Sequence, residues 1–223
     1  MRVFSLLDSR ASFNLLVEEG DAVTKGTVLM TFGGNARALL KAERTALNLL
    51  QRMSGIATMT RAFVNALAGS NTKIVDTRKT APGLRYLDKY AVRAGGGTNH
   101  RFCLSDGVLI KDNHIKASGG IAAAVSRARA VAPHTIRIEV ETENLDMVQQ
   151  ALAARADIIM LDNMTDAQMA EAVQLIAGRA LTEASGNVTV DRAAQIAATG
   201  VDLISSGALT HSVRAMDISM RFD

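Results

Sequence analysis

The 223-residue sequence has one cysteine, two prolines, no tryptophan and only 4% aromatic residues. The single cysteine, Cys103, excludes an intrachain disulfide and a cysteine-only metal cluster, and it is typical of a reducing compartment. No apolar run is long enough to span a bilayer, and the first residues lack the apolar core of a signal peptide. The scarcity of aromatic side chains argues against a base-stacking surface. We therefore expect a cytoplasmic protein with neither a membrane nor a nucleic-acid partner.

The rest of the composition is that of a globular protein, with 48% apolar and 21% charged residues. The charge is unevenly distributed along the chain. The formal net charge is +3, yet residues 78–101 alone carry +5. A local basic cluster of this kind indicates an anionic ligand rather than a general nucleic-acid surface.

The first third of the chain differs from the remainder. Residues 1–35 are typical of short strands and turns, with strand-like runs at 13–17 and 27–31. Residues 36–69 have apolar positions at helical spacing, and we expect Ser54-Gly55 to interrupt this helix.

A strand–turn–helix unit then repeats six times. Alternating strands and helices predict a parallel sheet. Six units fit an open doubly wound sheet or an incomplete α/β barrel, because a full barrel needs two more strands. The expected strands are 73–75, 108–110, 136–140, 158–161, 180–182 and 201–204, and the expected helices are 84–94, 121–130, 145–154, 167–176 and 192–199.

Polar or charged side chains follow every predicted strand. In both architectures the ligand site lies at the carboxyl ends of the strands, so we expect one site at this rim. The groups are Asp76 to Thr80, Lys111 to His114, Glu139 with Glu141, Asp162-Asn163, Glu183 to Asn187, and Ser205 to Gly207.

Two of these strand ends contain Ser-Gly pairs before a helical segment, namely Ser185-Gly186-Asn187 and Ser206-Gly207. Glycine lets the backbone approach a ligand closely, and a helix N-terminus attracts phosphate. Either loop could alternatively be a simple tight turn. Glu139 and Asp162 end neighbouring strands and are candidate Mg²⁺ ligands, unless they pair with Lys79 or Lys111.

The basic residues near this rim suit a substrate with more than one anionic group, because arginine binds carboxylates as a fork and lysine as a point charge. They are Arg78, Lys79, His100, Arg101 and Lys111. A second basic stripe, formed by Arg85, Lys89 and Arg93 at helical spacing, is interpreted as a solvated helix face.

The glycine triplet and two of the histidines are expected to have structural roles or are left undecided. Gly95-Gly96-Gly97 is either a helix cap and turn or the hinge of a lid. His114 and His211 lack the spacing of zinc ligands and are expected to be structural hydrogen-bonding residues.

Several strings of the sequence together resemble one enzyme family, the quinolinate phosphoribosyltransferases. The resemblance covers essentially the whole chain in order. Its strings are Glu43 to Asn48, Ser54 to Thr58, Asp76 to Arg85, Lys89 to Val92, Gly95 to Arg101, Ile110 to His114, Leu161 to Asn163, Glu183 to Gly186, and Gly207 to Ser212.

The resemblance implies an incomplete α/β barrel with an α/β sandwich formed mainly by the N-terminal part. On this basis residues 1–69 are a partial sandwich domain with connecting helices, 70–205 the barrel with the phosphoribosyl site, and 206–223 a segment returning to the N-terminal domain. Family members usually carry more sequence before the matching region, so we expect the sandwich to be incomplete here.

The resemblance also implies a reaction that requires Mg²⁺. The ring nitrogen of quinolinate attacks C1 of phosphoribosyl pyrophosphate, pyrophosphate leaves, and the 2-carboxylate is lost as CO₂ to give nicotinate mononucleotide. The enzyme supplies positioning and electrostatics rather than a nucleophile. A cation such as Lys111 or Arg101 could stabilise the negative charge that develops at ring C2.

The roles implied for individual residues cover binding, catalysis and assembly. Arg78, His100, Arg101 and Lys111 match positions that hold the two carboxylates, and Lys79 matches one near the pyrophosphate. Glu139 and Asp162 match positions that engage the ribose and metal, which with Lys79 and Lys111 gives the expected catalytic set. Arg44 matches a position that reaches into the neighbouring subunit's site, so a homodimer is expected. The expected phosphate cradle is Ser185, Gly186, Asn187, Ser206 and Gly207.

Four other functions remain open. One is a sibling transferase acting on another aromatic acid, although a monoacid would need fewer cations. A second is a related paralogue linked to metal utilisation, which the match at all quinolinate-contacting positions disfavours. A third is a non-catalytic form of the same fold, and a fourth is an unrelated phosphate-binding barrel isomerase, which would not explain the dense set of cations.

Overall fold

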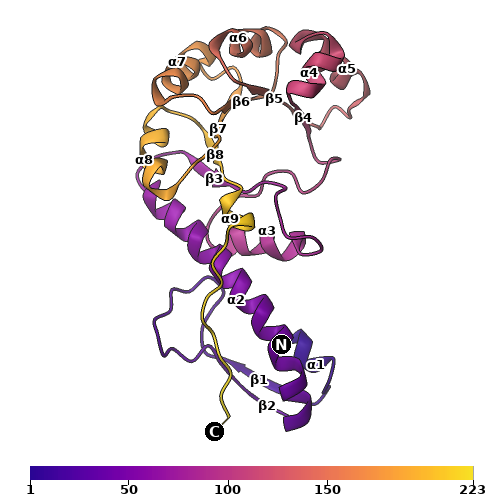
Figure 1. The fold of residues 1–223 in the computed structure, drawn as a ribbon, viewed down its shortest axis with the longest axis vertical. Helices are drawn as coiled ribbons and strands as arrows, with labels where there is room; N and C mark the ends of the chain where they lie inside the picture. Colours follow the sequence, from indigo (N-terminus) through magenta and orange to yellow (C-terminus); the bar gives the residue numbers. More distant parts are fainter. Residues whose placement is uncertain (223) are drawn as a thin grey trace.

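The computed structural model describes residues 1–222 and has two parts joined by one long helix (Figure 1). The smaller part contains the short helix α1 (Arg2–Ser5) and the strands β1 (Ser12–Leu15) and β2 (Met30–Gly33). The two strands pair antiparallel. The rings of Phe4, Phe13 and Phe32 meet with centroid separations of 5.0 to 6.5 Å and pack on the long helix.

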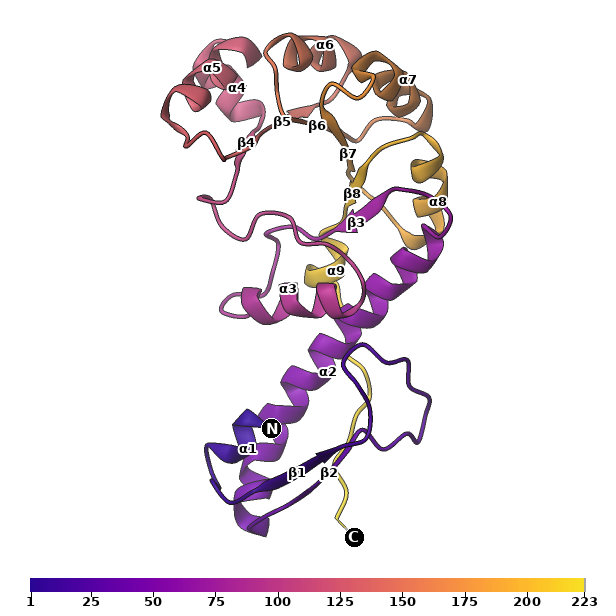
Figure 2. The same ribbon diagram turned by 180° about the vertical axis from the view of Figure 1, so that it is seen from behind.

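The long helix α2 (Ala36–Ala66) runs without a break from this small core to the larger part (Figure 2). Asn35 caps its start by accepting the backbone N–H groups of Arg37 and Ala38. The predicted interruption at Ser54-Gly55 is therefore wrong. Gly55 serves a packing purpose, because a Cβ atom there would collide with the backbone carbonyl of Arg214, which crosses the helix at this point.

The larger part is a six-stranded parallel sheet in the order β3-β8-β7-β6-β5-β4. The first strand lies beside the last and the others follow chain order, which is the order of a barrel and not of a doubly wound sheet. Among the described residues β3 and β4 do not pair, so the barrel is incomplete, as predicted. The strands are β3 (Lys73–Val75), β4 (Val108–Ile110), β5 (Ile138–Thr142), β6 (Ile158–Asp162), β7 (Leu181–Ser185) and β8 (Leu203–Ser205).

Alternate strand residues separate the hydrophobic core from the barrel interior. Val140, Ile159 and Leu161 have no exposed surface and pack in the core between the sheet and the outer helices. Glu139, Met160 and Glu183 point to the opposite face, inside the barrel. Burial of each aliphatic side chain stabilises the fold by about 1.5–3 kcal/mol, which fixes the strand register and hence the direction of the acidic groups.

The outer layer of helices covers the convex side of the sheet (Figure 1). The short helices α4 and α9 were not predicted, because the sequence of α4 is mostly polar and α9 has only four residues. Of the described residues, none belongs to a helix that is both long and apolar enough to cross a membrane. The helices that follow the strands from β4 onward are α4 (Asp112–Ser118), α5 (Ile121–Val131), α6 (Leu145–Ala153), α7 (Asp166–Ile176) and α8 (Val190–Ala198). Two more helices, α3 (Arg85–Ala94) and α9 (Ala208–His211), lie beside α2.

After α9, residues 212–222 run back along α2 to the small N-terminal part (Figure 2). The N–H of Met216 donates to the Gln51 carbonyl at 3.0 Å, and Gln51 Nε2 donates to the Ile218 carbonyl at 2.7 Å. Met220 packs against the Phe4 cluster. This segment therefore holds the two parts together alongside the helix.

Candidate active site

The gap between β3 and β4 is occupied by the segment that follows α3. Thr98 forms a parallel bridge with Val75, in which its N–H donates to the Ile74 carbonyl at 3.0 Å. This short pairing continues the sheet for one position and directs His100 and Arg101 into the mouth of the barrel.

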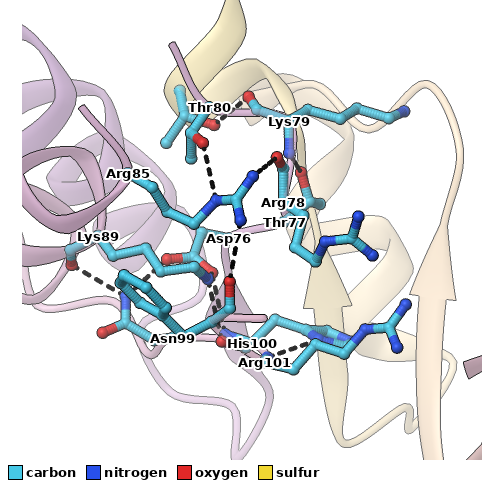
Figure 3. A network of polar contacts seen from close by, with 12 residues as sticks. Asp76, Thr77, Arg78, Lys79, Thr80, Arg85, Lys89, Asn99, His100 and Arg101 are labelled. Carbon is cyan, nitrogen blue, oxygen red and sulfur yellow. Dashed lines mark hydrogen bonds and ion pairs between the residues drawn. The ribbon is translucent and has the colours of Figure 1, made fainter. Parts of the chain in front are cut away.

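A buried carboxylate, Asp76 at the end of β3, holds this segment in place (Figure 3). It accepts hydrogen bonds from Lys89 Nζ, from the His100 N–H at 2.9 Å and from Asn99 Nδ2 at 2.6 Å. Lys89 Nζ also donates to the His100 carbonyl at 2.9 Å. Because both charges are buried, this clamp fixes the backbone of the loop that carries His100 and Arg101.

The solvated stripe predicted on α3 is wrong for Lys89, which is only 3% exposed. The helix turns Lys89 inward because the buried carboxylate of Asp76 requires a cation. Arg85 is half-buried and donates to Thr80 Oγ1 at 3.1 Å and to the Phe102 carbonyl at 3.3 Å. Only Arg93 is exposed as expected.

The predicted cations gather around the mouth of the barrel from three different loops. Arg78 and Lys79 are exposed after β3, and Lys111 is exposed at the start of α4. Figure 3 shows the side-chain ends of Arg78, Lys79 and Arg101 pointing the same way, away from Asp76. Burial and the neighbouring charge of Arg78 lower the pKa of Arg101. Such crowded like charges favour binding of an anion between them.

His100 lies deeper, between two buried carboxylates. Its Nε2 is 3.1 Å from Glu139 Oε2 and 3.6 Å from Glu183 Oε2, and its Nδ1 accepts the N–H of Arg101 at 2.8 Å. Burial disfavours the charged ring, but the two carboxylates outweigh this and raise the pKa of His100. Burial and the charge of Glu139 raise the pKa of Glu183 to about 7. Sequence reasoning assigned Glu183 no role.

The predicted metal pair Glu139 and Asp162 does not come together. Glu139 pairs with Ile158 in the sheet, so Asp162 lies four positions further along its strand, about 13 Å away at the usual rise per residue. Magnesium needs its ligand oxygens about 2.1 Å from the ion, so one ion cannot be held by both residues. The suggested ion pairs of Glu139 with Lys79 or Lys111 are not formed either.

Glu141 lies nearer to Asp162 than Glu139 does and has the exposure that a ligand at the mouth requires. It is two residues further along β5, on the same face, and its carboxylate pairs with Lys111 Nζ. Asp162 is half-buried on neighbouring β6 and accepts Asn163 Nδ2 at 2.7 Å. The alternation of Glu139 and Glu141 could have revealed this difference, because the residue nearer the strand end is closer to the mouth.

The two predicted phosphate loops are adjacent because β7 and β8 pair. Gly186 has φ of +96°, and a Cβ atom there would collide with the side chain of Asn163. At the second loop, a Cβ on Gly207 would lie 2.9 Å from His211 Cδ2 and 3.0 Å from Lys79 Cδ. Lys79 therefore lies across Gly207, with its backbone carbonyl accepting Thr210 Oγ1 at 2.8 Å.

Ser185 and Asn187 complete the first loop, with Ser185 half-buried and Asn187 exposed. The Ser185 carbonyl accepts the N–H of Asn163 at 3.0 Å, and Asn187 has φ of +48°. Ser206 is buried in the second loop, and its N–H donates to the Val75 carbonyl at 3.1 Å.

The glycine triplet forms a packed turn. A Cβ on Gly95 would lie 2.7 Å from Thr60 Cβ, and one on Gly97 would lie 2.6 Å from Thr60 Cγ2, so the turn lies directly on α2. The interpretation as a cap and turn holds, because Gly95 N–H donates to the Ala91 carbonyl at 3.0 Å. A hinge would need freedom that this contact with α2 removes.

The remaining predicted residues lie outside this cluster. Arg44 is exposed on the half of α2 beside the N-terminal part and has no ion pair within residues 1–222. His114 Nδ1 accepts the N–H of Lys111 at 3.0 Å, and His211 Nδ1 is 2.6 Å from Ser212 Oγ. Both histidines make the local hydrogen bonds that were expected of them.

An incomplete parallel barrel with crowded cations and two glycine-containing loops at one mouth defines a class of enzyme that binds anionic, phosphate-bearing substrates. Residues 1–54 match the model of the quinolinate phosphoribosyl transferase N-terminal domain, and residues 56–221 match that of its C-terminal domain. The chain belongs to the quinolinate phosphoribosyl transferase family.

Individual relatives agree with this assignment. A Synechocystis protein described as a probable nicotinate-nucleotide pyrophosphorylase (carboxylating) is 52% identical over 99% of this chain and 76% of its own length. The Mycobacterium leprae nicotinate-nucleotide pyrophosphorylase (carboxylating) is 49% identical over 92% of this chain and 72% of its own length. The crystal structure of NadC from Streptococcus pyogenes superimposes with a TM-score of 0.95 at 48% identity, covering 99% of this chain and 78% of that one.

Proposed function

We propose that this chain transfers the phosphoribosyl group of phosphoribosyl pyrophosphate to quinolinate, with loss of CO₂, to give nicotinate mononucleotide for NAD synthesis. The observation that carries the proposal is the set of cations at the carboxyl ends of the barrel strands. Arg78 and Arg101 point the same way at the mouth, Lys111 follows β4 and pairs with Glu141 on the next strand, and two glycine loops follow β7 and β8. A dianionic acid and a phosphorylated sugar together supply the negative charges that these groups would neutralise. We place the reaction in the cytoplasm.

The substrates divide between the two sides of the mouth. Arg78, Arg101 and Lys111 bind the two carboxylates of quinolinate, with the arginines acting as forks. His100, the fourth contact that the resemblance implies, is left out because its two ring nitrogens face the Arg101 N–H and Glu139. The loops at Ser185–Asn187 and Ser206-Gly207 bind the 5′-phosphate through their backbone N–H groups. Lys79 lies over Gly207 and stabilises the charge of the departing pyrophosphate.

Chemistry at this site depends on positioning and charge. The ring nitrogen of quinolinate is the nucleophile, so no side chain needs to form a covalent bond with the sugar. After transfer, the 2-carboxylate leaves as CO₂ and its electron pair stays at ring C2. A cation at the mouth, the ammonium group of Lys111 or the guanidinium of Arg101, stabilises that charge until a proton replaces it.

The donor groups at the mouth suit Mg²⁺, which prefers a few carboxylates together with phosphate oxygens and water. Asp162 and Glu141 would hold the ion, whereas Glu139 is turned towards His100. When bound, Mg²⁺ neutralises charge on the pyrophosphate group of the sugar substrate. With Glu141 available to hold the ion, Lys111 would be free to pair with the substrate carboxylate.

The functional unit in this proposal is a homodimer. Arg44 is exposed and has no ion pair within residues 1–222, although it matches a position that completes a neighbouring site. In the dimer each Arg44 contributes a cation to the partner's quinolinate pocket.

A turnover assay tests the proposal directly. The chain is mixed with phosphoribosyl pyrophosphate, Mg²⁺ and quinolinate labelled with ¹³C in the 2-carboxylate, and a parallel reaction contains nicotinate. We expect nicotinate mononucleotide and labelled CO₂ in equal amounts from quinolinate only. Product from nicotinate without CO₂ would show a sibling activity, and no product from either acid would support a non-catalytic form.

A further inference from the structure

The most unusual polar group in the barrel interior is Glu183, which the proposed reaction does not use. Glu183 is buried, and neither carboxylate oxygen makes a hydrogen bond of normal geometry among the described residues, although the buried Ser205 hydroxyl lies near enough to lower its pKa. Glu139 Oε1 is buried in the same way. Unpartnered buried carboxylates are costly, so their retention beside the substrate pocket calls for a role.

The ring of His100 connects these carboxylates with the substrate side of the mouth. Its Nδ1 accepts the N–H of Arg101 at 2.8 Å, so Nδ1 carries no proton in this arrangement. The ring proton is then on Nε2, facing Glu139 at 3.1 Å and Glu183 at 3.6 Å. The negative charges of Glu139 and Glu183 therefore favour the tautomer with its proton on Nε2, and this tautomer leaves Nδ1 free to accept the backbone N–H of Arg101.

The same three side chains are close enough to ligate a metal ion, but the hydrogen bond at Nδ1 argues against it. A histidine that binds metal through one nitrogen normally donates a proton from the other. Here the other nitrogen faces an N–H donor and cannot donate. The group is therefore better suited to fixing a proton on Nε2.

Arg101 is the residue that this arrangement orients. Its backbone N–H is held by His100, and its Nη1 donates to the Gly107 carbonyl at 2.8 Å. The remainder of its guanidinium is available to the substrate. On the opposite side, the backbone of His100 is fixed by Asp76 and Lys89, so the ring is the adjustable element between two anchored backbones.

We propose that Glu183, together with Glu139, is a positioning residue that holds His100 in its Nε2–H tautomer and thereby keeps Arg101 directed at a substrate carboxylate. The inference rests on the proposed function for the identity of that substrate. The tautomer of the His100 ring does not depend on which substrate binds, so an experiment can contradict this inference without contradicting the proposed function, and the reverse.

The first test is the ¹⁵N NMR spectrum of the histidine side chains in the wild-type protein. The chain has four histidines, and a His100→Asn variant identifies the resonances of the relevant ring. We expect His100 to show a protonated Nε2 and an unprotonated Nδ1 at pH 8. A protonated Nδ1 would overturn the inference whether or not the protein turns over.

The second test compares Glu183→Gln with Glu171→Gln, a matched change at an exposed position on α7. We expect E183Q to raise KM for quinolinate by about fivefold to tenfold, with KM for phosphoribosyl pyrophosphate and kcat within about twofold. The tautomer signature of His100 should weaken in E183Q alone. Unchanged KM and an unchanged spectrum would overturn the inference.

A further pair of variants tests the inference if E183Q fails to fold. His100→Asn retains an acceptor near the position of Nδ1, whereas His100→Gln places its amide near the position of Nε2. We expect the Asn variant to bind quinolinate more tightly than the Gln variant. The reverse order would contradict a role for His100 through Arg101. If wild type has the expected tautomer but no turnover, the proposed function fails and the positioning geometry stands.

Discussion

Two ion pairs at the same barrel mouth show how differently one kind of interaction can be used. Asp76 and Lys89 are at most 3% exposed, and the carboxylate accepts three hydrogen bonds. In the other pair, the side chain of Lys111 is 47% exposed and that of Glu141 is 15% exposed. The buried pair cannot change partners without leaving a charge unpaired, whereas the exposed pair can exchange one partner for a ligand. The buried pair thus fixes the backbone of the site, whereas the exposed pair can bind substrate.

The largest expected effect on stability comes from breaking the buried pair. Asp76→Asn leaves the charge of Lys89 without its partner, so the free energy of unfolding should fall by about 3–5 kcal/mol. Urea denaturation of D76N measures this, with D191N at an exposed aspartate on α8 as the control. The double variant D76N/K89M should recover part of the loss. A D76N protein as stable as D191N would show that the clamp is dispensable.

A smaller effect on stability concerns pH and the buried carboxylate of Glu183. Its pKa is raised from 4.5 to about 7 in the folded protein, so the folded state binds the proton more tightly. Stability is therefore fully present at low pH and falls as pH rises from about 4.5 to about 7, by about 1–3 kcal/mol. Unfolding measured at pH 5.5 and pH 8 should show this loss.

The neutral variant E183Q provides the comparison for that measurement. The raised pKa of His100 acts in the same direction, whereas the lowered pKa values of Asp8 and Asp106 act in the opposite one. The contributions of Asp8 and Asp106 are common to both proteins and cancel in the difference between them. Glu183 itself helps to raise the pKa of His100, so E183Q removes that part of the pH dependence as well. E183Q should therefore lose less stability between the two pH values, and equal losses would contradict the assignment to Glu183.

Breaking the exposed pair should affect activity far more than stability. Lys111→Ala should change the free energy of unfolding by less than about 1 kcal/mol, because the pair is solvated. It should lower kcat/KM for quinolinate by about a hundredfold, because a cation beside the reacting ring is lost. Lys116→Ala, at an exposed pair with Asp112, is the matched control. Normal CO₂ release by K111A would exclude Lys111 from the decarboxylation step.

The smallest expected effect on stability is at Arg44. Arg44→Ala should change the free energy of unfolding by less than about 0.5 kcal/mol, yet abolish most activity if the residue completes a partner's site. Mixing R44A with K79A subunits tests this, because half of the randomly formed dimers then contain one intact site. We expect recovery of about one quarter of wild-type activity. Mixtures as inactive as the separate variants would rule out the shared site.

Much of this architecture could be predicted because it depends on local patterns. The apolar strands alternated with amphipathic helices, and the strand ends showed where polar groups would gather. Contacts between distant residues could not be predicted in this way. Gly55 looked like a helix breaker because Arg214, whose backbone requires it, lies far along the chain. Lys89 looked solvated because its partner Asp76 belongs to a different element.

The charge of the candidate site could be predicted from the sequence, but the burial of its individual residues could not. The cations and both glycine loops followed from residue type and position at the strand ends. The order of Glu139 and Glu141 along β5 indicates which of them is nearer the mouth, but the distance from either one to Asp162 depends on the register with β6, which composition does not contain. The partners of His100 also come from two separate strands, so its inward orientation became visible only in three dimensions.

The path of residues 213–220 has a consequence for the order of synthesis. These residues pack on α2 and on the Phe4 cluster, more than 150 positions behind them, as the bond from Gln51 to Ile218 illustrates. On the ribosome, α2 and the small N-terminal core emerge long before the segment that covers them, a delay of about 10 s or more at ordinary translation rates. Strands β4 to β7 can pair during that interval, whereas the surface of α2 around Gly55 stays uncovered. Nascent chains halted before residue 213 should therefore be the form that chaperones and proteases recognise at the N-terminal part.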